Sequence, residues 1–100
     1  MNTEQNTKTK TMKVMKEIVE MPNEGLVSLL GENVLIFAMN YFYFGKLVGV
    51  NDQCVKIEKC HKVFETGPFT EKAFKNKQFI GEEWYVSISS IESFGKSPKL

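Results

Sequence analysis

The sequence predicts a single all-β domain that closes as a small five-stranded barrel and begins with one short helix. Aromatic and β-branched runs recur from position 34 onward, turn residues separate them, and a glycine interrupts the most aromatic run. The chain has 100 residues, a length that fits one domain with its own core. Barrel closure is expected because it leaves few exposed edges on a sheet of short strands.

The N-terminal region differs from the rest in composition. Residues 1–13 are rich in Thr, Asn and Lys, so we expect a disordered tail, or a basic arm that touches phosphates. Residues 14–21 fit neither the helical nor the strand period cleanly. A proline ends this segment, and Asn23 then offers a cap for a short helix over Glu24–Leu30.

Five strands are expected downstream, each bounded by turn residues. They cover residues 34–39, 41–50, 54–64, 84–88 and 91–94. In the fourth strand Trp84, Val86 and Ile88 alternate with polar or amphipathic neighbours, as in a strand with one buried face.

Gly45 lies inside the second predicted strand and indicates a bulge or sharp bend, which a small barrel needs where a strand turns a corner. Residues 67–81 form a long connection between the third and fourth strands. The predicted domain therefore spans residues 14–95, and residues 96–100 form a loose tail. SH3-like and OB-type barrels both fit this pattern.

The charge balance excludes several classes of function. Thirteen lysines oppose twelve acidic residues, for a formal net charge of +1, which is not typical of a strongly basic nucleic-acid binder. The chain has no arginine, so it lacks the bidentate fork that reads guanine edges. No apolar run is long enough to cross a bilayer, and the N-terminus lacks the apolar core of a secretory signal. We expect a cytoplasmic protein without a membrane partner.

Residues able to perform catalysis or bind metal are few. His61 and Asp52 are the single histidine and aspartate, and the two cysteines are Cys54 and Cys60. Six positions along one strand separate the thiols by about 20 Å, too far to form a disulfide or share a metal. Glu82 and its neighbour Glu83 would face opposite ways on a strand. We therefore expect no enzyme activity, no catalytic residues, no metal and no cofactor.

From Leu26 onward the chain resembles the Sm/Lsm family, which includes bacterial Hfq. Residues 30–34 (LGENV) fit the family's opening, where a Leu-Gly pair follows a short helix. Residues 45–52 (GKLVGVND) fit its first motif, and residues 84–91 (WYVSISSI) resemble its second. The resemblance covers residues 22–94 and implies an SH3-like five-stranded barrel of Sm type.

The resemblance also implies a partner and an assembly. Members bind single-stranded RNA as rings, so we expect a homo-oligomer of about five to seven subunits that binds RNA, or DNA, in RNA processing or chaperoning. The expected RNA-binding residues are Asn51, Asp52, Gln53, Lys56 and Ser87. Auxiliary contacts are expected from Lys72, Lys75 and Lys77. The expected subunit interface consists of the edge residues Trp84, Tyr85, Val86, Ile91 and Phe94.

Departures from the family pattern leave alternatives open. The family's base-binding Asn is replaced by Val55 or Lys56, and its Arg-Gly pair by Ser87-Ile88. Gln53 occupies the position of a base-stacking residue, so the family's uridine pocket does not transfer intact. A ring that binds only proteins, or an OB-type binder of single-stranded DNA, remains possible. The aromatic residues 41–44 could form core packing or a base-stacking platform.

Overall fold

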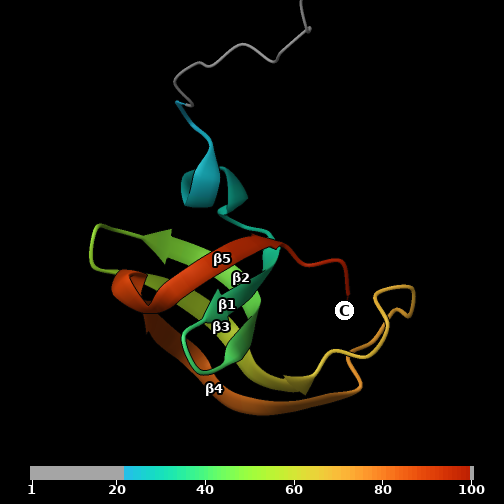
Figure 1. Cartoon of the computed structure of the whole chain (residues 1–100). Coiled ribbons are helices and arrows are strands. Elements are labelled where there is room, and N and C mark those ends of the chain that lie inside the picture. The colour runs from blue at the N-terminus through green and yellow to red at the C-terminus, as the bar shows by residue number, and fades with distance from the viewer. Residues whose placement is uncertain (1–21, 100) are drawn as a thin grey trace, which may run out of the picture.

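The computed structural model describes residues 22–99, and the expectations for residues 1–21 lie outside this range. Five strands and two 3-10 turns make up the fold (Figure 1). In chain order these are η1 (Gly25–Leu29), β1 (Asn33–Ala38), β2 (Phe42–Val50), β3 (Cys54–Glu65), β4 (Asn76–Ser87), η2 (Ile88–Ser90) and β5 (Ile91–Lys96). The predicted all-β class is confirmed.

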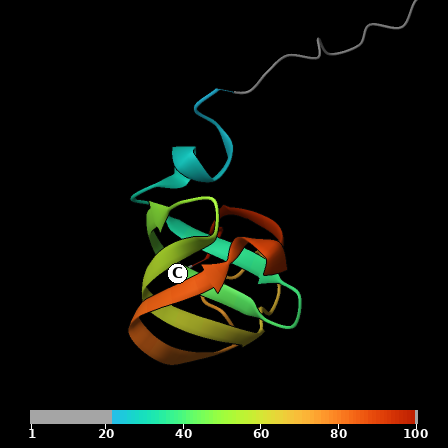
Figure 2. The same ribbon diagram turned by 90° about the vertical axis from the view of Figure 1, so that its left-hand side faces the viewer.

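All five strands belong to one antiparallel sheet with the order β4-β3-β2-β1-β5. Strands β1 to β4 follow one another as hairpins, and η2 then returns the chain to β1. The expected closed barrel is wrong, because β4 and β5 occupy opposite edges and do not pair with each other within residues 22–99. The three-residue η2 turn redirects the chain and does not close a β4–β5 hairpin (Figure 2).

The short helix expected over Glu24–Leu30 is a single 3-10 turn, η1. Its five residues are too few for a stable α-helix, and Glu24, not Asn23, occupies the cap position without a side-chain hydrogen bond. Leu26 and Leu29 pack against the core from this turn. None of the helices described is long and apolar enough to cross a membrane.

Gly45 lies at a sharp bend in β2, which confirms the prediction from sequence. The β2–β3 register shifts between Phe44 and Lys46, and Lys59 on the facing strand has a φ of 50°. A Cβ on Gly45 would lie 2.7 Å from the Glu58 carbonyl oxygen and would also overlap the Ile57 side chain. Only glycine allows β2 and β3 to approach this closely.

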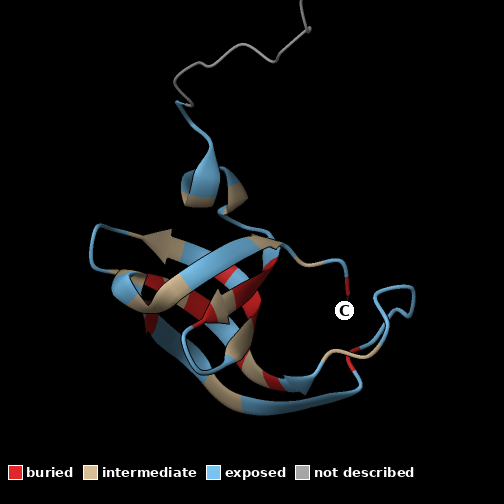
Figure 3. Cartoon of the chain, viewed as in Figure 1, coloured by how far each residue is buried: buried red, intermediate tan, exposed pale blue. Residues whose placement is uncertain are grey.

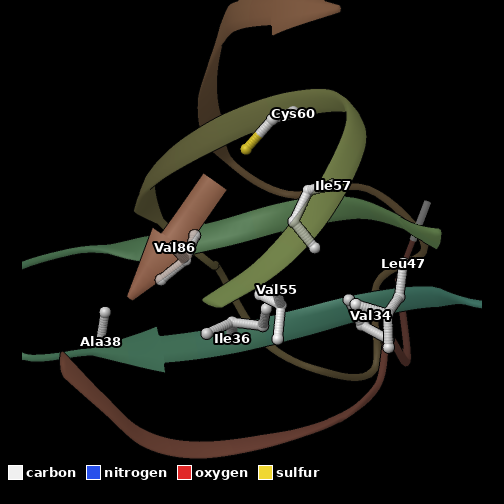
Figure 4. Close-up of a cluster of buried hydrophobic side chains, with 8 residues drawn as sticks. All are labelled: Val34, Ile36, Ala38, Leu47, Val55, Ile57, Cys60 and Val86. Carbon is white, nitrogen blue, oxygen red and sulfur yellow. The ribbon is translucent and has the colours of Figure 1, made fainter. Parts of the chain in front are cut away.

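The bend encloses the main core. Eight buried residues form it: Val34, Ile36, Ala38, Leu47, Val55, Ile57, Cys60 and Val86 (Figure 4). On the opposite face of β1, Leu35 packs in a second cluster with Phe44, Val63 and Phe74. Buried residues therefore lie on both faces of the sheet near β1 (Figure 3).

The long connection is shorter than expected, because β4 already begins at Asn76 and the loop covers only residues 66–75. The residues at the start of β4 are mostly exposed, so their polar composition does not prevent pairing with β3.

The C-terminal residues are not the loose tail that we expected. Lys96 ends β5, and Lys99 is only 2% exposed. The Lys99 ammonium donates hydrogen bonds to the carbonyls of Thr66 and, at 3.1 Å, Ala73. It also lies 5.5 Å from the ring centroid of Phe69. These contacts fasten the end of the described chain to the β3–β4 loop.

The two cysteines lie on β3 as expected, and both thiols are free. Cys60 belongs to the main core, and burial raises the pKa of its thiol to about 12. Cys54 is partly exposed at the start of the strand. No group of three or more metal-ligating side chains is present in the described part of the chain.

Gly45→Ala tests the bend. We expect the substitution to lower the free energy of unfolding by about 1–3 kcal/mol, the usual cost of forcing extra volume into a packed region. Gly95→Ala is the matched control, because a Cβ there meets nothing within 4 Å. Urea denaturation measures both, and equal effects would contradict the role of Gly45.

Cys60 predicts a pH dependence of stability. The unfolded thiol titrates near its ordinary value of 9, whereas the folded thiol keeps its proton up to about 12. Above pH 9 the unfolded chain therefore binds fewer protons, and the free energy of unfolding falls by up to about 1.4 kcal/mol per pH unit. Urea denaturation from pH 8 to about pH 10 measures this fall. The fall should be shallower in Cys60→Ala, and an unchanged slope in this variant would refute it.

Candidate nucleic-acid interface

The turn between β2 and β3 is built around the side chain of Asn51. Its amide oxygen accepts hydrogen bonds from the backbone N–H groups of Gln53 at 2.8 Å and Cys54 at 2.9 Å. The Asn51 N–H donates to the Cys54 carbonyl at 3.0 Å. This side-chain-closed turn leaves Asp52 and Gln53 exposed to solvent.

The same turn contacts η2, which joins β4 to β5. Ser87 pairs with Cys54 across the β3–β4 ladder, and the Ile88 N–H donates to the Gln53 carbonyl at 2.9 Å. Figure 1 shows both turns at the same end of the sheet. The structure thus brings together four of the five expected RNA-binding residues: Asn51, Asp52, Gln53 and Ser87.

Serine hydroxyls hold η2 in place. The Ser87 and Ser89 hydroxyls share a hydrogen bond of 2.9 Å, and the Ser90 hydroxyl donates to the Ser87 carbonyl at 2.8 Å. The Ser90 carbonyl accepts from the Met39 N–H at 2.8 Å, which connects η2 to the β1–β2 loop. Sequence reasoning missed the exposed Ser89, although the serine pair at 89–90 was visible within the second motif.

Lys56 is the fifth expected contact, and its charge is already engaged. Its ammonium lies 3.5 Å from a Glu83 carboxylate oxygen and 5.8 Å from the ring centroid of Tyr85. Both partners lie on β4, so Lys56 bridges β3 to β4 and does not point its charge toward the Asn51 turn.

The three auxiliary lysines lie at the other end of the long β3–β4 hairpin from the Asn51 turn (Figure 1). Lys72 is exposed in the loop, and Lys75 pairs with Glu65 at 3.7 Å. The Lys77 ammonium lies 4.9 Å from the Phe44 ring centroid. The structure therefore does not bring these lysines to the Asn51 turn.

The expected interface residues line both sheet edges. Trp84 and Tyr85 on β4 are 39% and 60% exposed, and Phe94 on β5 is 39% exposed. Ile91 is half-buried, and the Val86 side chain belongs to the main core, so only the backbone of Val86 is available at the edge.

The aromatic run at the start of β2 divides between the faces of the sheet. Phe42 and Phe44 pack in the second cluster, and Tyr43 packs against the main core. Tyr41 is exposed and is covered by the Lys62 ammonium, 3.7 Å from the ring centroid. Three of the four rings serve packing, so residues 41–44 do not form a continuous stacking platform.

No protein-family model matches the chain, and no curated protein matches it. The Asn51 turn and η2 together form one end of the sheet, the Asn51–η2 surface. What this surface can bind therefore follows from its own side chains. Polar groups on this surface can hydrogen-bond to polar edges such as those of unstacked bases. They are the Gln53 amide, the Asp52 carboxylate and the exposed hydroxyls of Ser87 and Ser89.

Asn51→Ala tests the turn that supports this surface. We expect the loss of two hydrogen bonds to lower the free energy of unfolding by about 1–2 kcal/mol. Asp52→Ala serves as the control, because exposed side chains without such bonds change stability by about 0.5 kcal/mol or less. Chemical denaturation compares the two, and an Asn51→Ala effect no larger than the control would contradict this role.

Proposed function

We propose that the chain is a subunit of an Sm-like ring that binds single-stranded RNA at the end formed by the Asn51 turn and η2. The main support is the Ile88 N–H to Gln53 carbonyl hydrogen bond. This contact joins segments more than thirty residues apart in the sequence into one polar surface. Gln53 directly follows the segment that resembles the first motif of the Sm/Lsm family, and Ile88 lies within the segment that resembles the second.

The two open edges support the ring. Within residues 22–99, strands β4 and β5 each have one neighbour, so both leave backbone donors and acceptors unpaired in this range, beside exposed aromatic side chains. Pairing β4 of one subunit with β5 of the next would satisfy both edges. Such a head-to-tail contact closes into a ring when the rotation per subunit divides a full turn.

In a ring, several copies of the Asn51–η2 surface compensate for the weak electrostatic attraction of one subunit for RNA. Asp52 repels phosphate, and Lys56 is paired with Glu83, so one copy of the surface has little electrostatic attraction for RNA. Several copies held around one axis would bind a strand at high effective concentration. We therefore assign base specificity to hydrogen bonds with base edges, and the affinity for RNA to the repeated copies of the surface in the ring.

A protein-binding ring without nucleic acid is the second candidate function. The observation that favours it is the Lys56–Glu83 pair, in which a carboxylate competes with phosphate for the Lys56 ammonium. In this case the exposed hydroxyl and amide groups would contact a polar protein surface.

Native mass spectrometry of the full chain with short oligo(U), oligo(A) and DNA strands at low salt tests the proposal. We expect a complex of about five to seven subunits that carries one RNA strand. A ring without nucleic acid would favour the second candidate, whereas a monomer that prefers DNA would favour an OB-type binder. A monomer without any strand bound would refute the ring and the RNA site together.

Gln53→Ala locates the binding surface. Because the substitution recurs in every subunit of a ring, we expect RNA affinity to fall at least about tenfold. Gln78→Ala is the matched control, since Gln78 is an exposed glutamine near the other end of β4. Equal affinities for the two variants in a fluorescence titration would place the RNA elsewhere.

A further inference from the structure

A second candidate site lies at the bend, on the side of β2 opposite the main core. A hollow of about 410 Å³ opens there between the start of β1, the bend in β2 and the middle of β3. Phe44 and Gly45 line it together with polar residues from all three strands. A volume of this size is within the range of small-molecule sites.

The hollow carries an excess of positive charge. Lys46 and Lys59 line it, and Glu58 is the one acidic residue among its lining residues. Neither lysine forms an ion pair with another residue of the described range 22–99. This distinguishes them from Lys56, Lys75 and Lys96, whose ammonium groups lie within 4 Å of carboxylates.

The backbone of β3 fixes the positions of two lining residues. Lys59 has a left-handed backbone, with φ of 50°, at the point where β3 faces the bend. The His61 Nδ1 lies 3.0 Å from the Lys59 carbonyl oxygen. Since a carbonyl only accepts, Nδ1 carries the proton, and Nε2 remains as the other polar atom of the ring.

Groups suited to a base lie beside those suited to a phosphate. The His61 ring lines the hollow and packs against the rings of Phe79 and Phe44, at 5.4 Å and 6.1 Å between centroids. The Asn33 amide and the Glu58 carboxylate offer donors and acceptors for the polar edge of a base. Two lysines, an aromatic ring and an amide side chain around one hollow match a nucleotide better than a bare anion.

We propose that this hollow binds a nucleotide, with its phosphate on Lys46 and Lys59 and its base against His61 and Asn33. The nucleotide could be free or part of a single strand, because the recognised chemistry is the same. The site lies on the outer face of the bend and is separate from the Asn51–η2 surface. It requires neither the ring nor RNA binding at the turn.

The test follows the backbone amide signals of the isotope-labelled full chain by NMR during titration with uridine monophosphate. We expect the amides of Asn33, Lys59 and His61 to shift, and uridine, which lacks the phosphate, to shift them far less. No shifts at these amides with uridine monophosphate, or equal shifts with uridine, would overturn the proposal.

Substitutions of Lys46 and Lys59 test whether these two lysines bind the phosphate. Lys46→Gln should weaken uridine monophosphate binding at least about fivefold, because a charge-assisted hydrogen bond is lost. Lys59→Asn should do the same and suits the left-handed backbone at this position. Lys72→Gln is the control of equal charge change and should leave binding unchanged. If Lys59→Asn fails to fold, the Lys46→Gln result decides, and affinity unchanged by Lys46→Gln would refute the site.

A second titration with short oligo(U) identifies the source of the nucleotide. Shifts at the same three amides that saturate at lower concentration than with uridine monophosphate would assign the site to a strand. Shifts with uridine monophosphate alone would assign it to a free nucleotide. Oligo(U) shifts confined to the Asn51 turn, with no response of the hollow to either ligand, would support RNA binding at the turn and overturn the nucleotide site.

Discussion

The close approach of β2 and β3 at Gly45 is the constraint on which the rest of the structure depends. Because this residue has no Cβ, the Glu58 carbonyl and the Ile57 side chain can lie against the β2 backbone. The two strands therefore bend together, and the inner faces of β1, β2 and β3 surround one core. The same bend leaves room on the outer face, where Phe44, Lys46 and His61 line a hollow.

The β3–β4 register explains why two turns that are distant in the sequence meet. Because Cys54 at the start of β3 pairs with Ser87 at the end of β4, η2 lies beside the Asn51 turn and its Ile88 N–H bonds to the Gln53 carbonyl. Polar side chains at this end are supported by backbone hydrogen bonds and not by buried charge. Such a surface can select ligands by the pattern of donors and acceptors, while attraction over longer distances must come from other parts of the assembly.

Local chemistry made several features predictable from sequence. Gly45 signalled the bend, Asn51 signalled the turn, and the apolar runs signalled β1, β2 and most of β3. The start of β4 could not be predicted, because an edge strand with exposed side chains needs no apolar alternation to pair through its backbone. The pairing of Lys56 with Glu83 depends on cross-strand register, and the burial of Lys99 depends on carbonyls far away in the sequence. Neither contact can be predicted from the local sequence pattern.

The return of β5 to β1 has a consequence for the order of folding. Strands β1 to β4 can form as successive hairpins, each closing a short loop, whereas Val34 must find Lys96 near the opposite end of the described chain. Closing that large loop has a higher entropic cost, and β5 recovers it through a single neighbour. We therefore expect β5 to dock last and to detach first, so that transient opening exposes the backbone edge of β1 before the main core is disturbed.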